Sequence, residues 1–153
     1  RGFSELATVG TGCEGRRLRF WDTATGSQLR MMDNVKTKTA EGEIWRGFYA
    51  VAYSPAGTEV VTLCETVEDS QTGMAMDSRS LGHSLELWDR HARDTVHVVT
   101  LKHRVICVDY SPEGNELAIN QSNALVLLDR KTRAPNRSIQ CEGLVFLLQF
   151  SPD

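Results

Sequence analysis

A glycine-rich stretch near the start of the chain is the first whose residue types and spacing could do chemistry. Residues 10–15, GTGCEG, have the spacing G-x-G-x-x-G that holds the pyrophosphate of a dinucleotide. That chemistry requires the loop to open a helix whose N-terminal amides face the phosphates. Residues 17–22 instead alternate polar and apolar side chains, which is typical of a strand. We therefore interpret the glycines as a hairpin that uses positive φ angles, and we expect no cofactor.

The histidines and carboxylates show no catalytic or metal-binding pattern. None of the four histidines has a partner four residues on, no H-E-x-x-H is present, and no cysteine stands at metal-ligand spacing from them (His83, His91, His97 and His103). The chain also lacks a G-x-S-x-G nucleophile elbow. We expect no metal site and no catalysis. An enzyme that binds a nucleotide through residues 10–15 is the lesser alternative.

Cysteine spacing and charge indicate the cellular setting. The four cysteines are 51, 43 and 34 residues apart without a C-x-x-C pair (Cys13, Cys64, Cys107 and Cys141). This predicts reduced thiols in an intracellular protein, cytoplasmic or nuclear. A net charge of −3 implies no bulk attraction to nucleic acid or to a membrane surface. No run of 18 apolar residues is present to span a membrane, and no signal peptide is visible.

Residues 104–129 give the clearest view of the elements that would position any site. Arg104–Tyr110 is almost continuously apolar and precedes a Ser-Pro-Glu-Gly turn. Glu116–Asn120 and Ala124–Leu128 are two further short strands, joined by a tight polar hairpin at 121–123. The sequence predicts three consecutive antiparallel strands, of which the first is buried on both faces.

The same order of segments recurs along the chain. YSPAG at 53–57 matches YSPEG at 110–114, and the sequences LRFWD, LELWD and LVLLD end at residues 22, 89 and 129. Trp88 precedes Ser111 by 23 residues, and Ser111 precedes Leu128 by 17. The basic repeat is therefore about 40 residues long, with four short strands in each unit.

This pattern resembles the WD-repeat β-propeller family. The resemblance rests on Trp21-Asp22, Trp88-Asp89, the degenerate Leu128-Asp129 and the aromatic-Ser-Pro turns, and it covers nearly the whole chain. It implies an all-β fold of four-stranded antiparallel blades, with repeat units of approximately 1–56, 57–113 and 114–153. Three units cannot close a ring, and both ends fall within a blade. We therefore expect part of a larger propeller, completed by the same or another chain.

The repeat frame places the remaining strands and predicts some structural roles. Further strands are expected at Leu6–Val9, Arg17–Trp21, Gln28–Met32, Phe48–Tyr53, Glu59–Cys64, Ser84–Trp88, Thr95–Leu101, Arg137–Cys141 and Leu144–Phe150. Asp22, Asp89 and Asp129 are expected to cap the turns that follow them. No Gly-His pair precedes an inner strand and Leu128 replaces a tryptophan. We therefore expect the His–Ser/Thr–Trp hydrogen-bond network of many such blades to be incomplete.

Two insertions point towards function. Residues 33–46 and 65–83 exceed the basic repeat, and both connections belong to the same face of a propeller. We expect long irregular loops that lie side by side, because loops on a rigid scaffold are where binding usually occurs. Tryptophan, methionine and arginine are enriched in interface cores, so the candidate partner-binding residues are Trp45, Met74, Met76 and Arg79.

The opposite face carries basic turns. They contain Arg90, His91, Arg93, Arg130, Lys131, Arg133 and Arg137. Such a face could meet the phosphates of RNA or of chromatin. Because no aromatic residue is interleaved for base stacking, we keep this as the alternative. The prediction is a non-catalytic scaffold or adaptor subunit of a multiprotein complex that binds other proteins through the inserted face, a role implied by the resemblance alone.

Overall fold

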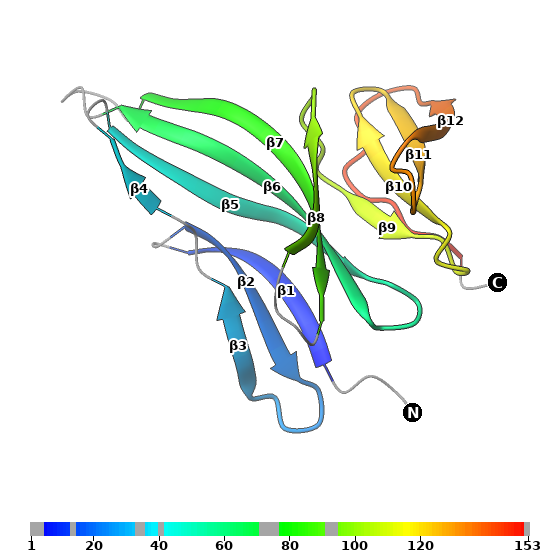
Figure 1. The fold of residues 1–153 in the computed structure, drawn as a ribbon, viewed down its shortest axis with the longest axis horizontal. Coiled ribbons are helices and arrows are strands. Elements are labelled where there is room, and N and C mark those ends of the chain that lie inside the picture. Colours follow the sequence, from blue (N-terminus) through cyan, green and yellow to red (C-terminus); the bar gives the residue numbers. More distant parts are fainter. Residues whose placement is uncertain are drawn as a thin grey trace.

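The computed structural model describes residues 5–12, 15–32, 36–39, 42–70, 77–90 and 95–151. These residues form twelve strands in three antiparallel sheets, and the described ranges contain no helix. The prediction of an all-β chain is confirmed. In Figure 1 the sheets fan out around the central one, and the described chain does not close a ring.

The first sheet contains β1 (Glu5–Gly12), β2 (Gly15–Asp22) and β3 (Gln28–Met32) in that order. Gly12 is paired with Gly15, so the glycine-rich stretch lies in an antiparallel hairpin and opens no helix. Residues 13 and 14 of the stretch lie outside the described ranges. The pairing confirms the hairpin, whereas Gly10 has no positive φ angle, so that part of the interpretation does not hold for this glycine. β1 is an edge strand of its sheet.

The central sheet is much longer than the sequence predicts. It contains β4 (Lys36–Lys38), β5 (Gly42–Tyr53), β6 (Glu59–Ser70), β7 (Asp77–Asp89) and β8 (Thr95–Leu101), in that order. The expectation of irregular loops at 33–46 and 65–83 is wrong for the described residues. Backbone pairs run without interruption from Tyr53↔Val60 to Gly42↔Ser70, apart from a bulge at 48–50, so the inserted residues extend the sheet.

The third sheet contains β9 (Val108–Tyr110), β10 (Glu116–Gln121), β11 (Ala124–Asp129) and β12 (Pro135–Gln140). The inner strand is shorter than the expected Arg104–Tyr110. The side-chain oxygen of Asn120 accepts the backbone N–H groups of Ile106 and Cys107 at 2.8 and 2.9 Å and replaces the strand ladder there. The expected strand at residues 144–150 is absent from the structure. No strand of the described chain pairs with these residues.

The two faces of the central sheet bury two apolar cores. One core joins the central sheet to the first sheet and includes Leu18, Phe20, Phe48, Val60 and Cys64. The other joins it to the third sheet and includes Val61, Leu63, Leu85, Leu87, Leu117 and Leu128. Neighbouring residues of β6 enter opposite cores, as the two-residue period of a strand requires. The central sheet is thus packed between two others.

The aromatic-Ser-Pro turns are the same structure in two sheets. Ser54 Oγ accepts the backbone N–H of Glu59, and Ser111 Oγ accepts that of Glu116, both at 3.1 Å. Gly57 and Gly114 occupy the same place in each turn with φ angles of 66° and 70°, which favour glycine. Because the two turns have the same hydrogen bond and the same glycine conformation, residues of the central sheet can be aligned with their counterparts in the third sheet.

The aspartates after the third strands cap turns as expected. Asp22 Oδ1 accepts the N–H groups of Ala24 and Thr25, and Asp129 Oδ1 accepts those of Lys131 and Thr132, at 2.7–3.0 Å. These backbone hydrogen bonds lower the pKa of both carboxyl groups. The prediction is confirmed for these two. The turn after Asp89 includes residues 91–94, which lie outside the described ranges.

Candidate interaction site on the extended central sheet

The extended end of the central sheet comprises β4 together with residues 42–47, 65–70 and 77–82. Figure 1 shows β5, β6 and β7 continuing to the upper left, past the ends of the first and third sheets. Ile44 is paired with Glu68, and Glu68 with Arg79, so the two inserted segments form one sheet. The expectation that the insertions lie side by side is confirmed. That the described parts of both segments are strands was not predicted from the sequence.

The side chain of Trp45 lies against the face of this sheet and is fixed there by a hydrogen bond. Its indole N–H donates to Asp69 Oδ2 at 2.8 Å, and Ser78 Oγ donates to the other oxygen of that carboxylate at 2.7 Å. A Cβ on Gly47 would come within 2.8 Å of the Trp45 ring, so the ring lies over this glycine. Only glycine leaves room for this packing, which gives the extended end a defined surface.

Of the other candidate partner-binding residues, the structure describes Arg79 but neither methionine. Arg79 is exposed on β7, directly opposite Glu68. Leu81 on the same strand exposes 42% of its surface, an apolar side chain that sequence reasoning did not single out. Met74 and Met76 lie outside the described ranges. The structure thus brings Trp45 and Arg79 into one sheet, two strands apart.

The extended end also has a free strand edge. β8 pairs with β7 only from His83 to Trp88. On that side residues 77–82 have no strand neighbour in the described chain. The backbone N–H and C=O groups of such an edge can pair with an added strand. The opposite edge is covered by β4, which carries Lys36 and Lys38, and lysines discourage edge-to-edge pairing.

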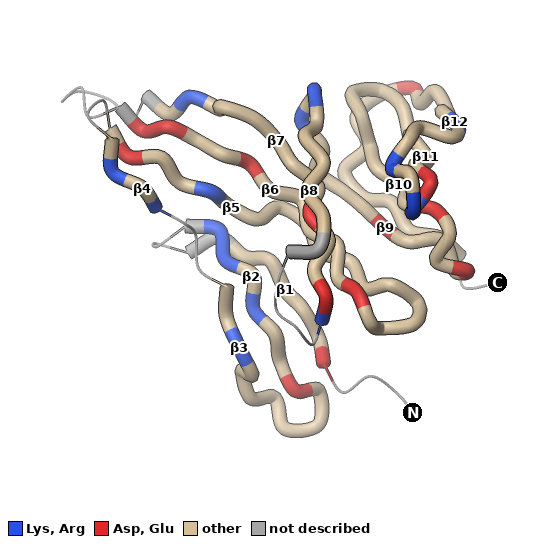
Figure 2. Tube along the Cα trace, in the orientation of Figure 1, with Lys and Arg blue, Asp and Glu red and all other residues tan. Residues whose placement is uncertain are grey.

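Charges of both signs lie close together on the extended end. Figure 2 shows basic residues on β4 and β7, acidic residues on β6, and one acidic and one basic stretch on β5. The acidic residues of β5 and β6 in this region are Glu43, Glu65, Glu68 and Asp69, and Lys36 Nζ lies 3.3 Å from Glu43 Oε2. A mixed surface of this kind suits a protein partner better than a polyanion, which needs clustered positive charge.

A buried ion pair supports the base of the extended end. The Glu86 side chain is only 2% exposed and pairs with the Arg46 guanidinium, which is 31% exposed. Ser84 Oγ donates to the other Glu86 oxygen at 3.1 Å. Nearby, burial raises the pKa of the Cys64 thiol, so this cysteine stays protonated. The pair links β5 to β7 where the sheet leaves the apolar core.

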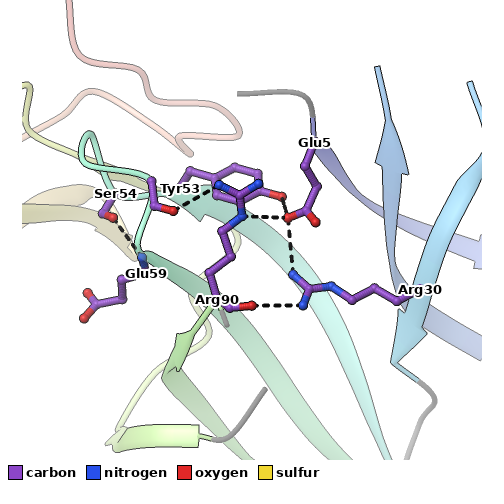
Figure 3. A network of polar contacts seen from close by, with 7 residues as sticks. Glu5, Arg30, Tyr53, Ser54, Glu59 and Arg90 are labelled. Carbon is purple, nitrogen blue, oxygen red and sulfur yellow. Dashed lines mark hydrogen bonds and ion pairs between the residues drawn. The ribbon is translucent and has the colours of Figure 1, made fainter. Parts of the chain in front are cut away.

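A second polar cluster joins the first sheet to the central sheet, and Figure 3 shows it. Glu5 Oε1 accepts hydrogen bonds from Tyr53 Oη at 2.8 Å, Arg90 Nε at 3.1 Å and Arg30 Nη2 at 3.2 Å. Arg30 also donates to the backbone oxygen of Arg90 at 3.1 Å. One carboxylate therefore connects three strands and the turn after β7.

The counterpart of this cluster joins the central sheet to the third sheet. Glu59 pairs with Arg130, whose Nε and Nη2 lie 3.3 and 3.1 Å from its two oxygens, and Tyr110 also donates to it. Burial first, and then the neighbouring glutamate, raise the pKa of both Tyr53 and Tyr110. The hydrogen bond to Glu59 in turn raises the pKa of Arg130. Each sheet contributes a tyrosine and an arginine to the glutamate of the preceding sheet.

These clusters bear on the basic face that the sequence suggests. Arg90 and Arg130 form ion pairs between sheets and have only 17% and 36% of their side chains exposed. Lys131 is exposed, and Arg133 occupies a turn position with φ 61°. His91 and Arg93 lie outside the described ranges, and Arg137 is exposed on β12. Two of the seven residues of the predicted basic face, Arg90 and Arg130, thus have acidic partners within the chain.

Three further observations concern the chemistry of the described residues. Within the described ranges no group of three or more His, Cys, Asp or Glu side chains could hold a metal ion. Cys64, Cys107 and Cys141 are free thiols, and the side chain of Cys13 lies outside the described part. No helix in the described part of the chain is long and apolar enough to cross a membrane.

Comparison with known proteins informs the fold only. No protein-family model matches the chain, and no curated protein matches it. Among solved structures it is similar to a chain of hydrazine synthase from Kuenenia stuttgartiensis, with a TM-score of 0.58 and 15% sequence identity. The match covers 94% of this chain and 35% of that chain, so this chain spans about a third of its length. At this identity the likeness shows a shared fold and carries no activity across.

Proposed function

We propose that the chain is a segment of a WD-repeat type β-propeller and acts as a non-catalytic scaffold that binds another protein through the extended end of the central sheet. The observation that carries this proposal is the length of β5, β6 and β7. They have 12, 12 and 13 residues, whereas the strands of the third sheet have 3 to 6. The added length extends past the two apolar cores, and its edge along residues 77–82 has no strand neighbour in the described chain, so this edge is open to a partner.

The propeller part of the proposal is supported by the repeated junctions. Glu5 with Tyr53 and Arg90 has the same arrangement as Glu59 with Tyr110 and Arg130. A junction that repeats from sheet to sheet relates consecutive sheets by one repeated rotation, and such a rotation closes into a ring when no translation along its axis accompanies it. The two junctions therefore favour consecutive blades over an open stack of sheets.

The free edge of β7 suggests how the partner binds. An extended segment of another protein can add to residues 77–82 as a further strand, with main-chain hydrogen bonds supplying affinity. Arg79 and Leu81 are exposed on this strand and would select the side chains of the added segment. The ion pairs of Arg90 and Arg130 leave less support for the alternative, binding of RNA or chromatin through the basic turns.

The test is a comparison of partners recovered with the intact chain and with a shortened one. Thr66 is paired with Gly82, so replacing residues 67–81 by Asn-Gly joins two strands at a matched register. Purified partners are identified by mass spectrometry, and folding is compared by circular dichroism. The proposal predicts that specific partners are lost while the fold persists.

Two control variants show whether loss of partners is specific to the extended end. Arg137→Ala changes an exposed residue of β12 far from the extended end and should retain all partners. Lys131→Glu with Arg133→Glu reverses charge on the basic turns and should also retain them. Partners that survive the shortened hairpin but disappear with the charge reversal would overturn the proposal in favour of the alternative.

A further inference from the structure

One tyrosine of the central sheet lies against two arginines from other parts of the chain. The guanidinium carbon of Arg16, on β2, is 3.9 Å from the centre of the Tyr49 ring, and that of Arg104, in the segment before β9, is 5.5 Å from it. Each contact is a cation–π interaction, which holds a cation close to an aromatic ring. Three segments that are distant in the sequence thus bring two positive charges to one ring.

Local structure places the tyrosine and both arginines. Tyr49 has no pairing partner in β6, because it is the extra residue of the bulge in β5, and a bulge re-aims the side chains beside it. A Cβ on Gly47 would lie 3.2 Å from the Cβ of Arg16, so the glycine permits β2 to approach β5 here. Asn120 accepts the backbone N–H groups of the second and third residues after Arg104 and so holds its segment in place.

The charges of the two arginines are compensated to different degrees. Arg16 Nη1 lies 3.8 Å from Glu65 Oε2, and their side chains are 29% and 14% exposed. Arg104 is exposed and forms no ion pair with a residue of the described ranges. Burial lowers the pKa of Arg16, Glu65 raises it, and the positive charge of Arg104 lowers it further. Glu65 therefore matches one of the two positive charges, and the charge of Arg104 is left over.

The hydroxyl group of Tyr49 gives a second, independent indication of a ligand. It is buried and has no hydrogen-bond partner among the described residues. Buried polar groups in native structures are nearly always paired, and an unpaired one calls for an explanation such as a bound ion. Two like charges close together are also unfavourable unless a group of opposite charge binds to both. A bound anion accounts for the unpaired hydroxyl and for the uncompensated arginine.

We propose that Arg16, Tyr49 and Arg104 form a binding site for a single oxyanion, the phosphate or carboxylate group of a small molecule or of a partner protein. Arginine suits this ligand because its planar guanidinium donates two parallel hydrogen bonds to the oxygens of such a group. One oxyanion fits better than a polyanion, since Glu65 would repel further negative charge. Glu65 belongs to the extended end of the central sheet, so the site adjoins the proposed partner-binding surface.

The first test is a titration of the intact chain with sodium phosphate and, separately, with sodium acetate, while sodium chloride keeps the ionic strength constant. The NMR signals of the arginine Nε–H groups report binding. The proposal predicts saturable shifts for Arg16 and Arg104, and the anion that saturates them at the lower concentration distinguishes phosphate from carboxylate. Arg137, exposed on β12, is the internal control and should show no saturable shift. The same response of all three arginines would overturn the proposal.

The second test separates a binding site from a structural contact, using Arg104→Gln. In chloride alone this variant should keep or raise the thermal unfolding midpoint, because it removes a positive charge close to Arg16. The stabilisation that phosphate or acetate gives the parent chain should be lost, since affinity should fall about 10- to 100-fold without these charged hydrogen bonds. Arg137→Gln makes the same change at an exposed position of β12 and should alter neither quantity.

A lower midpoint of Arg104→Gln in chloride, with the effect of both anions unchanged, would show that Arg104 is only a structural contact and would overturn the proposal. Affinity purification with the same variant distinguishes the two sources of the anion. Partners that are lost carry the anionic group themselves, whereas an unchanged set of partners assigns the site to a free anion. Because the NMR titration needs no partner, its failure would overturn this site without bearing on the strand edge at residues 77–82.

Discussion

The indole N–H of Trp88 donates a 2.9 Å hydrogen bond to the hydroxyl of Thr62 on the neighbouring strand. Trp21 makes the same bond to Thr8 at 2.8 Å in the first sheet. In the third sheet the counterparts are Leu128 and Ile119, both buried. The tryptophan and the threonine are thus replaced together, so that no polar group is left without a partner. Part of the expected Ser/Thr–Trp network is present in two sheets and replaced by apolar packing in the third.

Thr62→Val should destabilise the chain by about 1 to 2 kcal/mol, because it leaves a part-buried indole N–H without its acceptor. Urea unfolding followed by tryptophan fluorescence measures the effect. A double-mutant cycle with Trp88→Leu should give a coupling energy of at least about 0.5 kcal/mol, since the two residues act as a pair. Equal stability of Thr62→Val and the parent chain would show that the bond contributes nothing.

Glu86→Gln should lower the free energy of unfolding by more than most single substitutions do. It removes the charge from a carboxylate that is 2% exposed and abolishes the ion pair of Glu86 with Arg46. Removing one member of a buried pair costs about 3 to 5 kcal/mol, and the partial exposure of Arg46 places this case nearer 2 to 3. Glu43→Gln is the matched control. Its pair with Lys36 is more exposed, so the loss should stay below about 1 kcal/mol in the same urea experiment.

The sheet junctions predict loss of stability at alkaline pH. Burial and the glutamates raise the pKa of Tyr53 and Tyr110 in the folded chain. The unfolded chain releases these protons above about pH 10, so their contribution is complete below that pH and is lost as pH rises beyond it. In Tyr53→Phe with Tyr110→Phe, the unfolding midpoint should depend less on pH in this range than in the parent chain. Identical pH dependence of the two would contradict the assignment.

The turn aspartates predict an effect at acidic pH. Backbone N–H groups lower the pKa of Asp22 and Asp129 below the unfolded value of about 3.9. Their contribution is present above about pH 4 and is lost as pH falls through the folded pKa values. Asp22→Asn with Asp129→Asn keeps an acceptor oxygen but cannot titrate. Thermal unfolding from neutral to acidic pH should show a weaker decline for this variant, and an unchanged decline would place the acid sensitivity elsewhere.

The sequence was sufficient to predict the bounds of short strands that lie between repeated turn signals. Gln28–Met32 and Thr95–Leu101 match β3 and β8 residue for residue. It was insufficient for 65–83, because that segment is polar and residues 65–70 pair on one side with residues 42–47, a separate inserted segment, and on the other side with residues 77–82. Long-range pairing of this kind leaves little local pattern.

The sheet junctions were missed for a different reason. A glutamate, a tyrosine and an arginine separated by up to 85 residues match no motif, and Arg90 was interpreted only as part of a basic face. A signal was nevertheless available. Glu5, Glu59 and Glu116 stand at one position of the repeat, opposite the three turn aspartates. An acidic residue that recurs in this way indicates a repeated contact.

The most direct test of the account is hydrogen exchange of the intact chain, with and without a partner recovered in the affinity experiment. If the extended end is the binding site, the amides of residues 77–82 should exchange more slowly in the complex, because an added strand would accept hydrogen bonds from them. The turn at residues 130–134 should be unaffected. Protection confined to that turn, with unchanged exchange at 77–82, would contradict the central claim and identify the basic face as the site.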